Sequence, residues 1–145
     1  MGCFFALDIP DNIAEAVGQI HLDGEGVRNQ RRSDMHITLA YMGDLDDGQV
    51  EALLAQTRQL KTSETFNLSV QGVFYFPPQH GYRGHFYGAS IIKSDHLIQL
   101  KRKIDDLIDG LGLENYRGLG GFKPHITLFR SENPPKRDHL DDFMR

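Results

Sequence analysis

The tetrapeptide His-Ile-Thr-Leu occurs twice, at residues 36–39 and again at residues 125–128. Each copy lies in an apolar stretch that predicts a β-strand. Because side chains alternate between the two faces of a strand, His36 and Thr38 are expected on one face, with the isoleucine and leucine on the other. The second copy repeats this arrangement. Each strand is therefore predicted to pack one face on the core and to present an imidazole and a hydroxyl on the other.

Outward from these two stretches, strand patterns and helix patterns alternate along the chain. Strands are expected at residues 3–9, 35–42, 66–76, 85–92 and 123–129, and helices at residues 11–21, 46–60 and 94–110, with a loop at residues 23–34. Each half of the chain contains strand, helix and strand, and the later strand of each half carries the tetrapeptide. The predicted fold class is α+β, with bilobal duplicated β-α-β units whose two antiparallel-rich sheets line a central cleft.

Length and composition are those of one globular domain: 145 residues, of which 39% are hydrophobic and 25% charged. We expect a single domain over residues 1–145, with lobes at 1–76 and 85–130 and a tail at 131–145. The net charge of −4 argues against a protein that coats long nucleic acids, but it allows a small phosphate-bearing ligand held by a few cations. No apolar run approaches the roughly 20 residues of a membrane span, and no secretion signal is evident. A cytoplasmic monomer without a membrane partner is expected, and Cys3, the one cysteine, cannot form an internal disulfide.

The paired motif indicates acid–base chemistry. One imidazole, at His36 or His125, can accept a proton from a nucleophile while the other donates one to a leaving group. The hydroxyls of Thr38 and Thr127 can donate hydrogen bonds to the oxygens of a phosphoryl centre. A zinc site on the two histidines would need a third protein ligand, and neither motif has one at ligand spacing. No metal and no cofactor are expected.

Three segments together carry a family resemblance: residues 4–10 (FFALDIP), 36–43 (HITLAYMG) and 122–130 (FKPHITLFR). In these the chain resembles the two-histidine phosphoesterase superfamily, and within it the RNA 2′,3′-cyclic phosphodiesterases, which are also called 2′–5′ RNA ligases. It departs from the family pattern in the segment from residue 72 to residue 89, which is short and has residues 77–83 (PPQHGYR) in place of the usual arginine-rich turn. The resemblance implies metal-free opening of a 2′,3′-cyclic phosphate on an RNA end, an oligonucleotide or a cyclic nucleotide to a 2′-phosphate. It also implies that His125 is the general base, His36 the general acid and Arg130 a phosphate contact.

Other residues are weaker candidates for substrate contact. Tyr41 and Phe129 are possible stacking platforms for a base, and His85 follows the turn at which the cleft should open. Arg28, Arg31 and Arg32 form either a solvated loop or a rim that attracts phosphates. Two alternative functions stay open at this point. One is an enzyme that degrades cyclic or 2′–5′-linked signalling oligonucleotides, and the other is an RNA-end binding module with little turnover.

Overall fold

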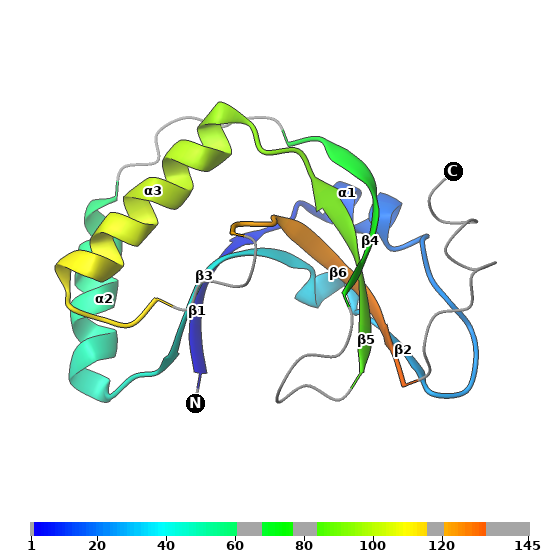
Figure 1. Cartoon of the computed structure of the whole chain (residues 1–145), viewed down its shortest axis with the longest axis horizontal. Coiled ribbons are helices and arrows are strands. Elements are labelled where there is room, and N and C mark those ends of the chain that lie inside the picture. The colour runs from blue at the N-terminus through cyan, green and yellow to red at the C-terminus, as the bar shows by residue number, and fades with distance from the viewer. Residues whose placement is uncertain (1, 61–67, 77–83, 116–120, 133–145) are drawn as a thin grey trace. The chain divides into compact units, whose positions relative to one another are not determined.

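The computed structural model describes residues 2–60, 68–76, 84–115 and 121–132. The elements in these ranges are β1 (Gly2–Asp8), α1 (Asp11–Val17), β2 (Val27–Asn29), the 3₁₀ turn η1 (Arg32–Asp34), β3 (His36–Asp44), α2 (Asp47–Gln59), β4 (Val70–Phe76), β5 (His85–Ile91), α3 (Asp95–Gly110) and β6 (His125–Ser131) (Figure 1). The α+β class is confirmed. The predicted tail and the departure at residues 77–83 lie outside the described residues, apart from the first two residues of the tail.

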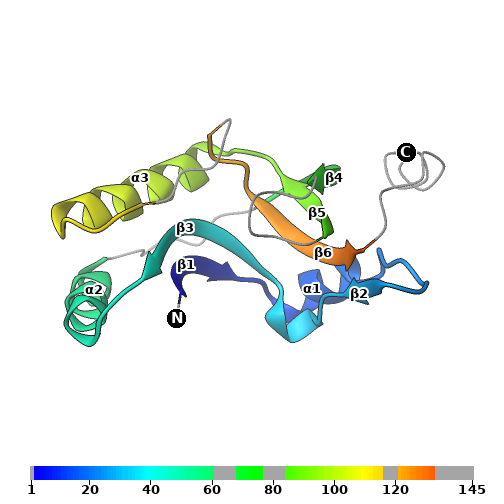
Figure 2. The ribbon, with the colours of Figure 1, turned by 60° about the horizontal axis from the view of Figure 1, so that its bottom comes forward.

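The strands are hydrogen-bonded in the order β1-β3-β6-β5-β4, and β2 also pairs with β6. β6 has antiparallel partners in β2, β3 and β5, and it lies beside β5 in both ribbon views (Figure 2). We expected two sheets, but the strands form one hydrogen-bonded series, because β3 pairs with β1 as well as with β6. The central cleft stays a prediction.

The chain divides into two compact units, and each unit draws on several separate segments of the sequence. The first unit takes residues 1–6, 38–68 and 93–123, and the second takes residues 7–37, 69–92 and 124–145. Both units therefore contain residues from both halves of the chain. Their boundaries differ from those of the predicted lobes, which follow the sequence consecutively.

In the first unit, α2 and α3 begin within one residue of their predicted starts, and a side chain caps each helix. Asp46 accepts a hydrogen bond from the backbone N–H of Gln49, and the Gln49 side chain accepts one from the backbone N–H of Asp46, which completes a capping box. The Ser94 hydroxyl oxygen accepts from the backbone N–H of Leu97 in the same way at the start of α3. α3 then buries one apolar stripe, made of Leu97, Leu100, Ile104 and Ile108. No helix in the described parts of the chain is long and apolar enough to cross a membrane.

In the second unit, the core lies on one face of the paired strands β3, β5 and β6. Ile37 and Ile126 face each other across β3 and β6, and Ala89 on β5 lies opposite Ile126. All three side chains are at most 1% exposed. Tyr87 stacks on Phe129 at 4.7 Å between ring centroids, and burial, with a smaller contribution from Tyr75, raises the pKa of Tyr87.

Several predicted boundaries are wrong, among them those of the strand expected at residues 123–129, which runs from His125 to Ser131. The stretch 23–34 is not all loop, because it contains β2 and η1. Three residues are too few to show an alternating pattern, so only the pairing with β6 reveals β2 as a strand. The first helix was expected to reach residue 21, but it ends at Val17, where Gly18 disfavours further helix.

Candidate active site

The register between β3 and β6 places the two predicted histidines on one face of the sheet. Ile37 pairs with Ile126 in antiparallel orientation, and both side chains are buried. His36, one residue before Ile37, therefore lies opposite Thr127, one residue after Ile126. His36, His125 and Thr127 then share the face that is turned away from the buried isoleucines, and all three are half-buried. Below, this is called the histidine face.

His36 is oriented by a backbone carbonyl. Its Nδ1 lies 2.7 Å from the carbonyl oxygen of Asp34, two residues earlier in the chain. A carbonyl oxygen can only accept a hydrogen bond, so Nδ1 carries the proton in this contact. Nε2 is therefore the ring nitrogen of His36 that is left for proton exchange.

His125 is oriented by its neighbours on β4 and β5. The ring of Phe76 lies 4.5 Å from the His125 ring, centroid to centroid. Ser90 lies directly opposite His125 on β5, and Gly88 lies opposite Thr127. A Cβ atom on Gly88 would lie 3.1 Å from Cδ2 of His125. The glycine thus leaves the space into which the imidazole leans.

Replacing Gly88 with alanine is expected to shift the His125 ring by a few tenths of an ångström, because the added Cβ also meets the backbone oxygen of Ile126 at 3.1 Å. Since catalysis is sensitive to such displacements, we expect kcat to fall by up to about tenfold with a smaller change in KM. Steady-state kinetics measure this. The matched control is Gly110→Ala, because a Cβ at Gly110 would have nothing within 4 Å. Equal kcat values for Gly88→Ala and wild type would contradict the inference that Gly88 leaves space for the His125 ring.

A β-bulge in β6 interrupts the alternation after Thr127. Gly88 pairs with Thr127, but the preceding residue, Tyr87, pairs with Phe129. Leu128 is therefore an extra residue on β6, as in other bulges. Leu128 and Phe129 are both buried, at 2% and 1% exposed.

The bulge decides which of the later β6 residues reach the histidine face. Strict alternation from His125 would place Phe129 on this face and Arg130 in the core. The structure has the reverse: Phe129 packs in the core against Tyr87, and Arg130 is half-buried opposite Phe86. The structure therefore corrects the prediction that Phe129 contacts substrate, whereas Arg130 lies on the same face as His125.

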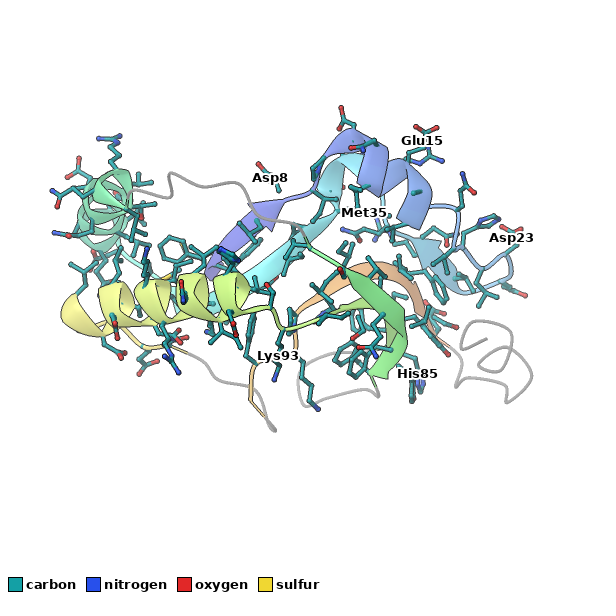
Figure 3. All side chains as sticks on the ribbon, turned by 90° about the horizontal axis from the view of Figure 1, so that it is seen from above. Asp8, Glu15, Asp23, Met35, His85 and Lys93 are labelled. Atoms are coloured by element: carbon teal, nitrogen blue, oxygen red, sulfur yellow. The ribbon has the colours of Figure 1, made fainter. Side chains whose placement is uncertain are left out.

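The other two predicted contacts are not brought to His125 by the second unit. On β5, Phe86, Gly88 and Ser90 follow one face, so His85 lies on the opposite one. Figure 3 labels His85 at the start of this strand. His85 Nδ1 is 2.6 Å from the hydroxyl oxygen of Tyr75. Tyr41 belongs to the first unit, where its side chain is 40% exposed, and its contact with substrate stays a prediction.

Thr38 follows His36 by two residues on β3 and is half-buried, so by alternation it points to the same side of that strand. The burial pattern of β3 resembles that of β6: in each, the histidine and threonine are half-buried, and two consecutive apolar residues after the threonine are buried. The repeat in the sequence thus extends to the local structure.

Two residues of the histidine face were missed by the sequence interpretation: Gly88 and Ser90. Gly88 carried a usable signal, because a glycine inside a strand often marks a close approach of another group. Ser90 gave no signal, since its place beside His125 depends on strand register. Among the described residues, no three His, Cys, Asp or Glu side chains gather closely enough to hold a metal ion.

Comparisons with known proteins show the family and the fold. The model of the 2′–5′ RNA ligase superfamily matches residues 9–143. The RNA 2′,3′-cyclic phosphodiesterase of Methanocaldococcus jannaschii is 24% identical over 144 residues, which cover 98% of this chain and 78% of the relative. Among solved structures, a protein of Thermus thermophilus has a TM-score of 0.74 at 23% identity, covering 94% of this chain and 78% of that one. E. coli LigT, in complex with 3′-AMP, has a TM-score of 0.65 at 22% identity, with coverage of 92% and 75%.

Proposed function

Because the chain belongs to the 2′–5′ RNA ligase superfamily and hence to the two-histidine phosphoesterases, we propose that it opens RNA 2′,3′-cyclic phosphate ends to 2′-phosphates by acid–base catalysis. The observation that carries this proposal is the pairing of Ile37 with Ile126. In that register His36 and His125 are diagonal neighbours on adjacent strands, and sheet geometry places their Cα atoms about 7–8 Å apart. One phosphoryl group fits between two imidazoles at such a spacing.

In the proposed reaction, His125 accepts a proton from water while the water oxygen forms a bond to phosphorus. The bond between phosphorus and the ribose 3′ oxygen breaks, and His36 Nε2 donates its proton to that oxygen. His36 Nδ1 keeps its proton throughout and donates it in a hydrogen bond to the Asp34 carbonyl oxygen, so Nε2 is the ring nitrogen that is reprotonated for the next cycle. Thr127 and Thr38 donate hydrogen bonds to the two non-bridging oxygens, where charge accumulates as phosphorus becomes five-coordinate.

The M. jannaschii relative bears the name of this activity, which supports the choice of substrate class. The family name includes joining of 2′–5′ linkages, so a reversible ligation at the same centre is the second candidate. Joining uses the two histidines in the same roles, with the hydroxyl of a second RNA end in place of water, and cleavage of the 2′–5′ linkage exchanges these roles.

A substrate panel with and without a strong chelator tests the proposal. It contains an RNA with a 2′,3′-cyclic phosphate end, the four cyclic mononucleotides, 2′–5′ oligoadenylate and cyclic di- and trinucleotides. We expect the cyclic-phosphate RNA to give a 2′-phosphate, identified by phosphorus NMR, at the same rate in chelator. Turnover of 2′–5′ or cyclic oligonucleotides alone would replace this function with signal degradation, and binding of the RNA end without product would replace it with a binding module. A rate that collapses in chelator would contradict the metal-free mechanism.

A further inference from the structure

Ser90 on β5 lies beside the histidine that is proposed as the general base. It is directly opposite His125 in the pairing of β5 with β6. Residues opposite each other in antiparallel strands project to the same face, with Cβ atoms about 4.5–5.5 Å apart. Ser90 is only half-buried. A hydroxyl is thus placed on the histidine face, next to the ring that is proposed to activate water.

The fold does not use the hydroxyl of Ser90. The side chain of Ser94, four residues later, caps α3, whereas the Ser90 hydroxyl makes no hydrogen bond to any other described residue. On its other side, two exposed residues of β4, Gln71 and Gly72, lie opposite Ser90 at an irregularity in the pairing of β4 with β5. A Cβ atom on Gly72 would meet nothing within 4 Å, so the neighbouring strand leaves room there. The Ser90 hydroxyl is therefore available to a water molecule or a ligand.

The order of the strands puts Ser90 on the side from which water would attack. His36 on β3 and Ser90 on β5 lie on opposite sides of β6, the strand that carries His125. In phosphoryl transfer the attacking and leaving oxygens are roughly in line through phosphorus. Because His36 is proposed to protonate the leaving oxygen, the attacking water is expected on the side of β5.

The attacking water has two hydrogens, and each needs an acceptor. One is the proton that His125 accepts while the water oxygen forms its bond to phosphorus. The other hydrogen stays on that oxygen. A serine hydroxyl oxygen has two lone pairs and can accept a hydrogen bond from it. The two threonine hydroxyls of the proposed mechanism do not serve this purpose, because they donate to the non-bridging oxygens.

We infer that Ser90 holds the attacking water by accepting a hydrogen bond from the hydrogen that His125 does not take. The inference rests on the proposed function and deepens it, because Ser90 becomes a catalytic residue that favours water over an alcohol as the nucleophile. An alcohol has one hydroxyl hydrogen, which goes to His125, so it has none to donate to Ser90. Ser90 thereby biases the enzyme towards hydrolysis and against the joining of RNA ends.

The partition between water and methanol tests this role. In a fixed water–methanol mixture, opening of a 2′,3′-cyclic phosphate gives a 2′-phosphate from water and a 2′-methyl phosphodiester from methanol, and phosphorus NMR measures both. In Ser90→Ala, kcat for hydrolysis should fall about two- to tenfold with little change in KM, as expected for one lost hydrogen bond between neutral groups. The rate of methanolysis should change little. The ratio of methyl product to 2′-phosphate should therefore rise by the same factor.

Two further variants control this measurement. Ser90→Thr keeps a hydroxyl at the same position, so its product ratio should stay near that of wild type. Ser69→Ala removes an exposed hydroxyl just before β4 and leaves the backbone carbonyl that accepts from the N–H of Ile92, so both products should form at wild-type rates. An equal fall of both products in Ser90→Ala would overturn the inference, because Ser90 would then act on His125 or on the phosphate rather than on water.

The wild-type reaction separates this inference from the proposed function. If wild type forms neither product from any cyclic-phosphate substrate, the proposed function fails and the role of Ser90 fails with it. If wild type forms both products and Ser90→Ala forms them in the same ratio, only the role of Ser90 is rejected. If wild type forms the 2′-phosphate alone, the methyl product must appear in Ser90→Ala, and its absence rejects the role.

Discussion

Replacing either His36 or His125 with alanine is expected to lower kcat/KM for a cyclic-phosphate RNA end at least about 100-fold, the lower end of the usual range for a general acid or base. In the proposed mechanism the two imidazoles act on opposite sides of the same phosphorus, so removing either one leaves one proton transfer to water. The double variant should be little worse than the poorer single variant, because the two groups act as one unit. Steady-state kinetics on the purified variants measure both effects.

The pH profile of kcat/KM should be bell-shaped in wild type, since one imidazole must be neutral and the other protonated. Removing the base should abolish the acidic limb, and removing the acid should abolish the basic limb, which identifies the roles of His36 and His125. His21→Ala is the matched control: its Nδ1 lies 3.0 Å from the carbonyl oxygen of Gln19, two residues earlier, just as His36 contacts Asp34. Near-normal turnover in His36→Ala would reject the acid–base assignment.

The sequence was sufficient where local rules decide the structure. The capping residues Asp46 and Ser94 mark the starts of α2 and α3 because a side-chain acceptor near a helix start satisfies exposed N–H groups, whatever the rest of the chain does. The alternation in each copy of the tetrapeptide likewise predicted that Ile37 and Ile126 would be buried and that the histidines would not be.

The sequence was insufficient where the pairing of strands decides on which face a side chain lies. The bulge at Leu128 exists only because β5 and β6 pair in one particular register, and it exchanges the faces of Phe129 and Arg130. β2 is a strand only because it pairs with β6, and this pairing places Arg28 opposite Arg130. Sequence patterns report on one strand at a time, so neither the wrong assignment of Phe129 nor the missed strand β2 could have been avoided from periodicity alone.

Ile126→Ala is expected to destabilise the protein by about 2–5 kcal/mol, the range for removing a large aliphatic side chain from a core. Ile126 is 1% exposed and lies between Ile37 on one neighbouring strand and Ala89 on the other. Neither neighbour can fill the cavity without moving its own strand. Ile126→Val should cost only about 0.5–1.5 kcal/mol, since it removes one methyl group.

Denaturant unfolding measures both variants, and kinetics at low temperature on the folded protein separate stability from catalysis. Ile126 separates His125 and Thr127 in the chain, so its packing holds the strand that carries both. We therefore expect Ile126→Ala to lose stability first and to retain far more kcat than His125→Ala. A variant as stable as wild type would place Ile126 outside the core, and it would remove the register on which the shared histidine face depends.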